Sequence, residues 1–519
     1  MKSLSSFTEY DVVIVGGGHA GLEAAAAAAS SSPRTVLITA SKTDVGKLSC
    51  NPSVGGLAKS QIVCEVNSVG GLMGKLADVC AVHADILNSS RGKAVQAIRL
   101  QIDAPLFHIA SIDALKQIKI IESEVSSVNL LCGRFYVNTS HTTAISSKTV
   151  VIATGTFSRA VCHLGESTLS YGRFKDCRKS CLAAIFRKYG VKLRRFKTST
   201  PPRIKRDSVN WDETQPMATA SLKCGFSKHL TKFLLKMCCR SVATNSNTNK
   251  LIAEYANTSA SNTGKLLGKG PRLCTALETK TSKLKNKPLR LILEPESTDC
   301  ENVYLNGAFT SLAIEVQTAV LNTMKTFEKS EIAQIGYAVE YDAVCSSEIS
   351  QTLELKALAG LFLAGQINGS TGYEEAGAQG WLAGVNAARK SQNKPLLAPK
   401  KTTSYIGVLT HDISARSLKE PYRALSVNTQ NRTLFRQRNA ILRLLSNALI
   451  ASQLPRNSES ACLKWAQLSK VPTAKAGELS RFTVDLRRIL RPFLARNCKW
   501  AKLINTMVFK GKYSAQWRK

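Results

Sequence analysis

The sequence predicts an α/β protein with a discontinuous, Rossmann-type dinucleotide-binding domain, one or more inserted domains and a C-terminal helical region. Three observations support this fold class. A strand, a glycine-rich turn, a helix and a second strand follow one another near the N-terminus. Two further strand-to-turn elements occur far downstream. The segments between and after these elements differ in composition, as separate domains do.

The N-terminal segment has the pattern of a βαβ unit. Residues 11–15 form a β-branched run, GGGHAG follows, and the alanines of LEAAAAAAS favour a helix before the strand Thr35–Thr39. In this βαβ unit Gly16, Gly18 and Gly21 fit the G-x-G-x-x-G pattern, in which glycines allow a pyrophosphate to approach the helix N-terminus. No acidic residue ends the second strand, so this turn alone leaves both NAD and FAD open.

Two later segments repeat the strand-to-turn pattern. They are VVIATGT (Val150–Thr156) and LFLAG (Leu361–Gly365), and the second leads into the predicted helix GYEEAGAQGWLAGVNAA. A helix N-terminus at this point suits a flavin, because its dipole stabilises the negative charge of the reduced ring. We therefore expect one discontinuous FAD-binding domain. The alternative is three unrelated βα turns in an α/β fold.

Composition divides the chain into four parts. We expect the first part of the FAD domain in residues 1–203 and its second part in residues 289–399. Residues 204–288 are rich in Ser, Thr, Asn and Lys, which predicts an inserted domain on the NADH or substrate side. The strand Leu289–Pro295 should then return the chain to the main sheet. Residues 400–519 show much helix signal and predict a basic helical region that binds tRNA or a partner.

The charge predicts a polyanionic partner. The chain has 519 residues, and 71 Lys and Arg against 36 Asp and Glu leave a formal net charge of +35. Residues 173–206 and 481–519 concentrate the excess, and the second segment mixes aromatic residues among its cations. Phosphate neutralisation with stacking on unpaired bases would explain this mixture, so nucleic acid is the leading candidate. A solvated basic surface, or an anionic membrane surface, is the alternative.

Other sequence features bear on location. Apolar residues make up 44% of the chain, but no run approaches the roughly 18 consecutive apolar residues of a membrane-spanning helix. The 15 cysteines include no CxxC pair and no zinc-like spacing, which favours free thiols in a reducing interior and predicts no metal site. No signal or transit peptide precedes the first strand, so we expect a cytoplasmic location.

Longer motifs resemble the MnmG (GidA) family. The matching stretches extend over about residues 8 to 440. They include YDVVIVGGGHAGLEAA, LSCNPSVGGLAKSQIVCEVNSVGGLMG, ILNSSRGKAVQAIRLQID, TSTPPRI, GKGPRLC, LEPES, GYAVEYD, GLFLAGQINGSTGYEEAGAQG and KEPYR. The resemblance implies an FAD-dependent enzyme that adds an aminomethyl or carboxymethylaminomethyl group to C5 of the wobble uridine in certain tRNAs. It also implies NADH as reductant, methylenetetrahydrofolate as one-carbon donor, a homodimer, and a heterotetramer with an MnmE-type GTPase.

The same resemblance implies site residues. The essential cysteine pair falls at Cys50, in SCNP, and at Cys274, in GPRLC. The expected FAD contacts are Gly16, Gly17, Gly18, His19, Ala20, Gly21, Val125 and Gln366. The expected NAD contacts are Gly270, Pro271, Arg272, Leu273, Glu278 and Lys280. Arg91, Arg99 and Gln101 lie in a strip on the substrate side, where they would meet flavin, folate or RNA phosphate.

Uridine chemistry explains the cysteines. C5 of uracil becomes nucleophilic when a soft thiolate adds at C6. We expect backbone N–H groups of the loop to lower the pKa of Cys50, and Arg272 to lower that of Cys274. The alternative for each is a small buried hydrophobe. Which sulfur attacks C6 stays open, with Cys274 favoured.

Some positions depart from the family pattern. The serine that contacts flavin falls at Ala183, the SRAEYR motif is replaced from Val427 to Arg432, and the chain is shorter than its relatives. These departures leave two other functions open. One is a degenerate, non-catalytic FAD- and RNA-binding protein. The other is a folate-dependent tRNA uridine methyltransferase relative, although such chains lack SCNP.

Overall fold

The computed structural model describes residues 7–92, 94–140, 145–173, 176, 182–220, 225–227, 238–271, 276–284, 287–441, 443–444 and 447. The chain divides into two compact units, Met1–Gln453 and Leu454–Lys519, and every described residue belongs to the first. The second basic segment predicted above, residues 481–519, lies outside the described residues.

The main sheet has seven strands in the order β6-β2-β1-β9-β8-β7, with β20 also paired to β9. The parallel strands are β1 (Thr8–Val15), β2 (Thr35–Thr39), β6 (Lys119–Glu122), β9 (Ile145–Ile152) and β20 (Leu361–Leu363), and the antiparallel ones are β7 (Val125–Leu131) and β8 (Arg134–Thr139). β9 pairs with β8 along its first half and with β20 along its second half, so the late strand enters the sheet beside an early one. The predicted α/β class with a parallel Rossmann-type sheet is confirmed.

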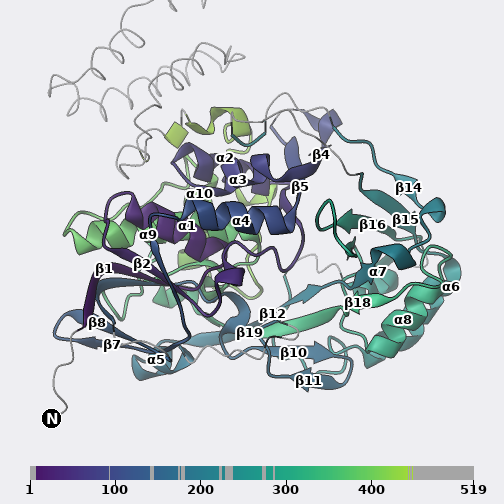
Figure 1. Ribbon diagram of the computed structural model, residues 1–519, viewed down its shortest axis with the longest axis horizontal. Helices are drawn as coiled ribbons and strands as arrows, with labels where there is room; N and C mark the ends of the chain where they lie inside the picture. Colours follow the sequence, from purple (N-terminus) through teal and green to yellow (C-terminus); the bar gives the residue numbers. More distant parts are fainter. Residues whose placement is uncertain are drawn as a thin grey trace, which may run out of the picture. The chain divides into compact units, whose positions relative to one another are not determined.

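Two helices pack closely beside this sheet, α1 (His19–Ala29) and α9 (Tyr373–Ser391), and Figure 1 shows them side by side. Small residues make this possible. A Cβ on Gly380 would lie 2.0 Å from the carbonyl oxygen of Ala20, and one on Gly384 would lie 2.3 Å from that of Ala24. The alanine-rich face of α1 therefore packs directly on the glycine face of α9.

A three-stranded sheet, β3-β5-β4, packs with three helices beside the main sheet. Its strands are β3 (Ser53–Gly55), β4 (Ala81–Leu87) and β5 (Ala97–Ile102), and its helices are α2 (Lys59–Ser68), α3 (Met73–Val79) and α4 (Ala104–Ala114).

A four-stranded antiparallel sheet has the order β11-β10-β19-β12. Its strands are β10 (Val161–Leu164), β11 (Ser167–Leu169), β12 (Leu193–Thr200) and β19 (Tyr337–Val344), and helix α5 (Ala183–Lys188) precedes β12.

A six-stranded sheet, β14-β15-β16-β17-β13-β18, has its own apolar core. Its strands are β13 (Arg203–Lys205), β14 (Gln215–Pro216), β15 (Arg240–Ala243), β16 (Arg290–Pro295), β17 (Asn302–Asn306) and β18 (Ile332–Gln334), with helices α6 (Ser246–Tyr255), α7 (Leu277–Leu284) and α8 (Ile314–Asn322).

One strand placement predicted from the sequence is wrong. The strand at Leu289–Pro295 exists as β16, but it pairs antiparallel with β15 and β17 and does not join the main sheet. A short apolar run fits the interior of either sheet, so its composition could not reveal its neighbours. The six-stranded sheet also continues to β18, beyond the predicted boundary at residue 288. The predicted domain boundaries stay predictions.

The described part of residues 400–447 contains α10 (Tyr405–Ala415), short 3₁₀ turns and no strand. Buried Glu65 of α2 accepts hydrogen bonds from the backbone N–H groups of Tyr405 and Ile406 and pairs with Arg443 at 2.8 Å. Among the described residues, no helix combines the length and the apolar character needed to cross a membrane.

Candidate functional site

A cavity of about 360 Å³ lies at the carboxyl ends of the parallel strands. Its walls include the turns that follow β1, β2, β9 and β20, because parallel strands bring the segments after their carboxyl ends to one edge of the sheet. Of the residues predicted to hold FAD, the lining contains Gly16, Gly17, Gly18, His19, Ala20, Val125 and Gln366.

The glycine turn is shaped for close backbone approach. Gly16 has φ +107°, and a Cβ there would lie 2.4 Å from the carbonyl oxygen of Ala153. Gly21 does not line the cavity, but a Cβ on it would lie 1.7 Å from the oxygen of Gly16. Gly18, in contrast, has open space where its Cβ would be. The first and last glycines therefore build the turn, and the middle one leaves room for a ligand.

The N-terminus of α1 faces this space with unused donors. Gly18 caps the helix without a side-chain hydrogen bond. The hydrogen bonds of the described residues include none from the backbone N–H groups of His19, Ala20 or Gly21. These groups and the helix dipole favour an anion such as a diphosphate.

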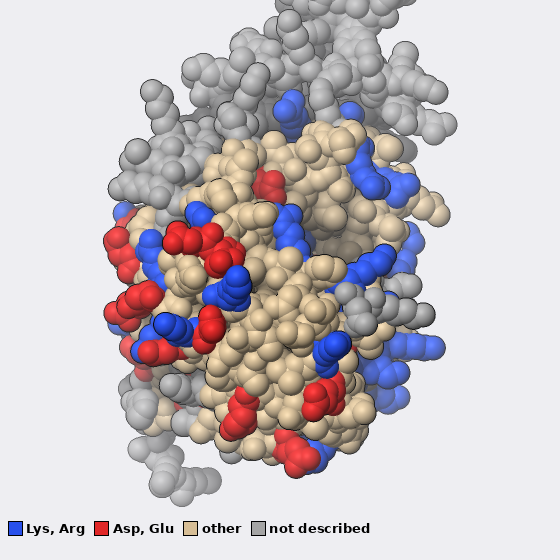
Figure 2. Space-filling view, turned by 90° about the vertical axis from the view of Figure 1, so that its right-hand side faces the viewer, with Lys and Arg blue, Asp and Glu red and all other residues tan. Residues whose placement is uncertain are grey.

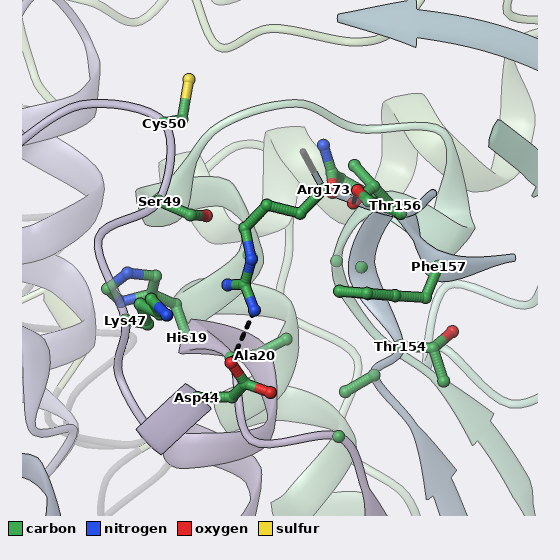
Figure 3. A pocket seen from close by; sticks show the side chains of 18 of the residues that line it. His19, Ala20, Asp44, Lys47, Ser49, Cys50, Thr154, Thr156, Phe157 and Arg173 are labelled. Carbon is green, nitrogen blue, oxygen red and sulfur yellow. Dashed lines mark hydrogen bonds and ion pairs between the residues drawn. The ribbon is translucent and has the colours of Figure 1, made fainter. Parts of the chain in front are cut away.

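Cys50 lies on the wall of the same cavity, in the loop before β3. Its backbone N–H and that of Asn51 both donate to the hydroxyl oxygen of Tyr373, the first residue of α9. In Figure 3 the thiol points away from Arg173. The cysteine loop is thus held by α9, the helix that follows Gln366.

The expected lowering of the Cys50 pKa is wrong for this structure. Burial raises the pKa of the thiol above its ordinary value, and the charges of Arg423, Arg203 and Lys59 only partly oppose this effect. The loop N–H groups that were expected to stabilise a thiolate are bound by Tyr373 instead.

His19 packs between aromatic rings. Its ring centroid lies 4.3 Å from that of Tyr373 and 5.7 Å from that of Phe107. Burial lowers the pKa of His19 to about 4, which keeps the imidazole neutral near pH 7. The side chain therefore links the glycine turn to the tyrosine that holds the cysteine loop.

A buried ion cluster stabilises the N-terminal turn of α9. Lys59 Nζ lies 2.7 Å from Glu374 Oε2 and 3.3 Å from Glu375 Oε2. Glu374 also accepts a hydrogen bond from the backbone N–H of Gly55, and Glu375 accepts one from that of Ala424. One cation thus ties α9 to the segment after Cys50 and to the segment around Arg423.

Two further ion pairs connect the cysteine loop to the six-stranded sheet. Arg203 pairs with Glu296 at 2.9 Å and donates to the carbonyl oxygen of Ser49 at 3.1 Å. Arg99, predicted on the substrate side, pairs with Glu294 at 2.6 Å. The LEPES motif therefore supports the cysteine loop from outside the cavity.

A comparable network lies in the four-stranded sheet, where Glu340 contacts His163 at 3.3 Å and Arg195 at 3.1 Å. Burial raises the pKa of Glu340, but the hydrogen bond from His163, the charge of Arg195 and the backbone N–H of Gly268 outweigh burial and hold it at about 2.

The remaining predicted residues are scattered. Pro271 lines the cavity, whereas Gly270, Glu278 and Lys280 are not among the lining residues. The Glu278 carboxylate accepts hydrogen bonds from Thr310 and Ser311, and Lys280 donates to the carbonyl oxygen of Gly307. Gln101 donates to the carbonyl oxygen of Pro295, and Arg91 is exposed. Arg272, Leu273 and Cys274 lie outside the described residues, so the predicted roles of Arg272, Leu273 and Cys274 stay predictions.

Sequence reasoning missed several lining residues. They are Asp44, Lys59, Phe157, Arg173, Tyr373 and Arg423. Tyr373 and Arg423 lie inside the motifs GYEEAGAQG and KEPYR, which could have singled them out. Arg173 was noted only as the start of a basic segment. In Figure 2, Lys and Arg side chains border a hollow on one face, while most Asp and Glu side chains of that face gather elsewhere.

Known proteins resemble this chain over most of its length. The family model "Glucose inhibited division protein A" matches residues 11–395. The tRNA uridine 5-carboxymethylaminomethyl modification enzyme MnmG of Protochlamydia amoebophila is 38% identical over 84% of this chain and 71% of its own length. An MnmG of Thermus thermophilus is 38% identical over 86% of this chain and 76% of its own. The structure of Aquifex aeolicus GidA, in its form II crystal, superimposes with a TM-score of 0.81 at 32% identity and covers 90% of this chain and 79% of its own.

Proposed function

Because the chain belongs to the glucose inhibited division protein A (GidA, MnmG) family, we propose that it is the flavoprotein that modifies the wobble uridine of certain tRNAs. The reaction installs a carboxymethylaminomethyl or aminomethyl group on C5. One observation carries the proposal: the dinucleotide turn, the N-terminus of α9 and Cys50 line a single cavity.

The chain's residues fit FAD. The glycine turn and the open N-terminus of α1 would hold the diphosphate, Val125 the adenine side, and Gln366 the flavin side. When bound, FAD supplies the redox chemistry that the one-carbon transfer needs. The proposal also includes NADH as the reductant and methylenetetrahydrofolate as the carbon donor. The segment from Gly270 to Lys280 would bind NADH.

The cysteines supply nucleophilic catalysis. One thiolate adds to C6 of the uracil, which forms a C–S bond and makes C5 nucleophilic toward the one-carbon unit. C5 then forms a C–C bond to the methylene carbon, and ammonium or glycine displaces the folate nitrogen from that carbon. Loss of the C5 proton finally restores the C5=C6 bond and expels the thiolate. Because burial raises the pKa of Cys50, Arg423, Arg203 and Lys59 provide the charges that favour its ionised form.

The partners follow from charge and family. The net charge of +35 attracts the tRNA polyanion, and a homodimer joined to an MnmE-type GTPase forms the complete enzyme in the cytoplasm.

Nucleoside analysis of tRNA tests the proposal. The full chain is expressed in cells that lack other MnmG activity, alongside Cys50→Ser, Cys274→Ser and the control Cys132→Ser, which changes an exposed thiol outside the cavity lining. The modified wobble uridine should appear with the wild type and the control and vanish with the other two variants. FAD and tRNA binding without modification would support a non-catalytic protein, and 5-methyluridine would support the methyltransferase relative.

A further inference from the structure

Arg173 is one of the charged residues that line the cavity described above. Its Nη2 lies 2.7 Å from Asp44 Oδ1 and 2.7 Å from Asp176 Oδ2, and its guanidinium carbon lies 5.7 Å from the ring centroid of Phe157. The side chain is 17% exposed and lines the cavity. In Figure 3 its side chain extends down to Asp44, with which it forms an ion pair. A charged group is therefore held on the wall of the cavity that a dinucleotide would enter.

This guanidinium keeps unused hydrogen-bond donors. Both of its hydrogen bonds to carboxylates leave from Nη2, and the hydrogen bonds of the described residues include none from Nε or Nη1. Three N–H bonds of the group thus have no partner in the described part of the chain, although the place is partly desolvated. Desolvation strengthens any bond that these donors make to an anion.

The unused donors adjoin the open N-terminus of α1. Arg173 lines the same cavity as His19 and Ala20, the first residues of that helix. The backbone N–H groups of these residues also lack partners among the described residues. Two independent sets of donors, one charged and one on a helix dipole, therefore face the same volume.

We infer that Arg173 binds the diphosphate of the dinucleotide together with the N-terminus of α1, while Asp44 and Asp176 hold its Nη2 in place. The inference rests on the proposed function, because it concerns the same FAD site. Arg173 would then give the site its preference for a diphosphate ligand. Because adenosine carries no phosphate, its affinity should not depend on Arg173.

Calorimetric titration of the full-length apoprotein with FAD, ADP and adenosine tests the inference. Arg173→Met should weaken ADP and FAD binding about 10- to 100-fold, the loss expected for charge-assisted hydrogen bonds, and should leave adenosine binding unchanged. Arg173→Lys should recover part of the ADP affinity, since it keeps the charge without the planar fork.

Arg195→Met is the matched control. Arg195 is 18% exposed and also pairs with two carboxylates, Glu340 and Asp342, but it does not line the cavity. This variant should bind ADP like the wild type. Circular dichroism verifies that each variant is folded.

Two results would overturn the inference. One is unchanged ADP affinity in both Arg173 variants. The other is an equal loss of ADP and adenosine binding in folded Arg173→Lys, since that pattern indicates a distorted cavity. If the wild type itself binds neither FAD nor ADP, the proposed FAD function fails as well, and that outcome is distinct from both.

Discussion

Replacing Gly380 by alanine should loosen the contact between α1 and α9 on which the FAD cavity depends. The added methyl group would lie 2.0 Å from the carbonyl oxygen of Ala20, where ordinary contact begins at 3.4 Å. The neighbouring atoms are backbone, so no side chain can rotate away. The two helices must therefore separate, or α9 must shift along its axis, before the methyl group fits.

The expected magnitude combines two opposing terms. Alanine stabilises a helix by about 1 kcal/mol relative to glycine. Overpacking of a rigid contact costs about 1–3 kcal/mol and occasionally more. Gly377→Ala isolates the first term, because its methyl group would meet the flexible end of Met73 at 2.8 Å. We expect the free energy of unfolding to be about 2 kcal/mol lower in Gly380→Ala than in Gly377→Ala.

Urea unfolding followed by the release of bound flavin measures this difference. Flavin release reports directly on the cavity, since Ala20 lines it and Gly380 packs against Ala20. The midpoint for Gly380→Ala should fall below that of the wild type, and that for Gly377→Ala should stay near it. Equal midpoints for the two variants would refute the claim that backbone contact of these helices supports the cavity.

Three further predictions concern charged groups. In the folded protein the pKa of Glu340 is about 2, below the ordinary value of 4.5. The ionised carboxylate therefore stabilises the folded state by up to about 3 kcal/mol. This contribution is complete above pH 4.5 and is lost as the pH falls toward 2. Thermal unfolding temperatures should therefore fall more steeply on acidification in the wild type than in Glu340→Gln, and equal slopes would contradict this. Lys59→Met should lower the free energy of unfolding by about 3 kcal/mol, because it leaves the Glu375 carboxylate buried without its cation; a change below about 1 kcal/mol would show that the cluster is dispensable. Iodoacetamide should alkylate Cys50 only at a higher pH than it does an ordinary exposed thiol, as measured by peptide mass spectrometry. In Arg423→Met this pH should be higher still. The same pH profile in Arg423→Met and the wild type would exclude the proposed effect of the Arg423 charge.

The dinucleotide element could be predicted because its physics is local. A β-branched strand, glycines that permit close backbone contact and an alanine helix are all adjacent in the sequence, and β2 has the predicted bounds Thr35–Thr39. The C-terminal end of β9 and the strand β20 were predicted at Val150 and Leu361 for the same reason, as short apolar runs that end in glycine-containing turns, although β9 begins earlier, at Ile145.

Other features depend on contacts between distant residues. β16 could not be assigned to its sheet, since its partners β15 and β17 bond to it through the backbone. The N–H groups that the Cys50 loop offers locally are taken by Tyr373, 323 residues away, so burial decides the direction of the thiol pKa. Arg173 was missed because only folding brings it to Asp44. The local sequence pattern predicted the glycine turn, whereas contacts between distant residues decided the pKa of Cys50 and the position of Arg173.

The interleaving of early and late segments in the FAD cavity has a consequence for biosynthesis. β1, β2 and β9 are complete once residue 152 has been translated, yet β20 and the first turn of α9 follow more than 200 residues later. A nascent chain thus exposes the alanine face of α1 and one side of β9 until α9 leaves the ribosome. Long-range strand pairing of this kind is slow and open to aggregation. Flavin loading should consequently come late, after β20 and α9 have completed the sheet and its cavity.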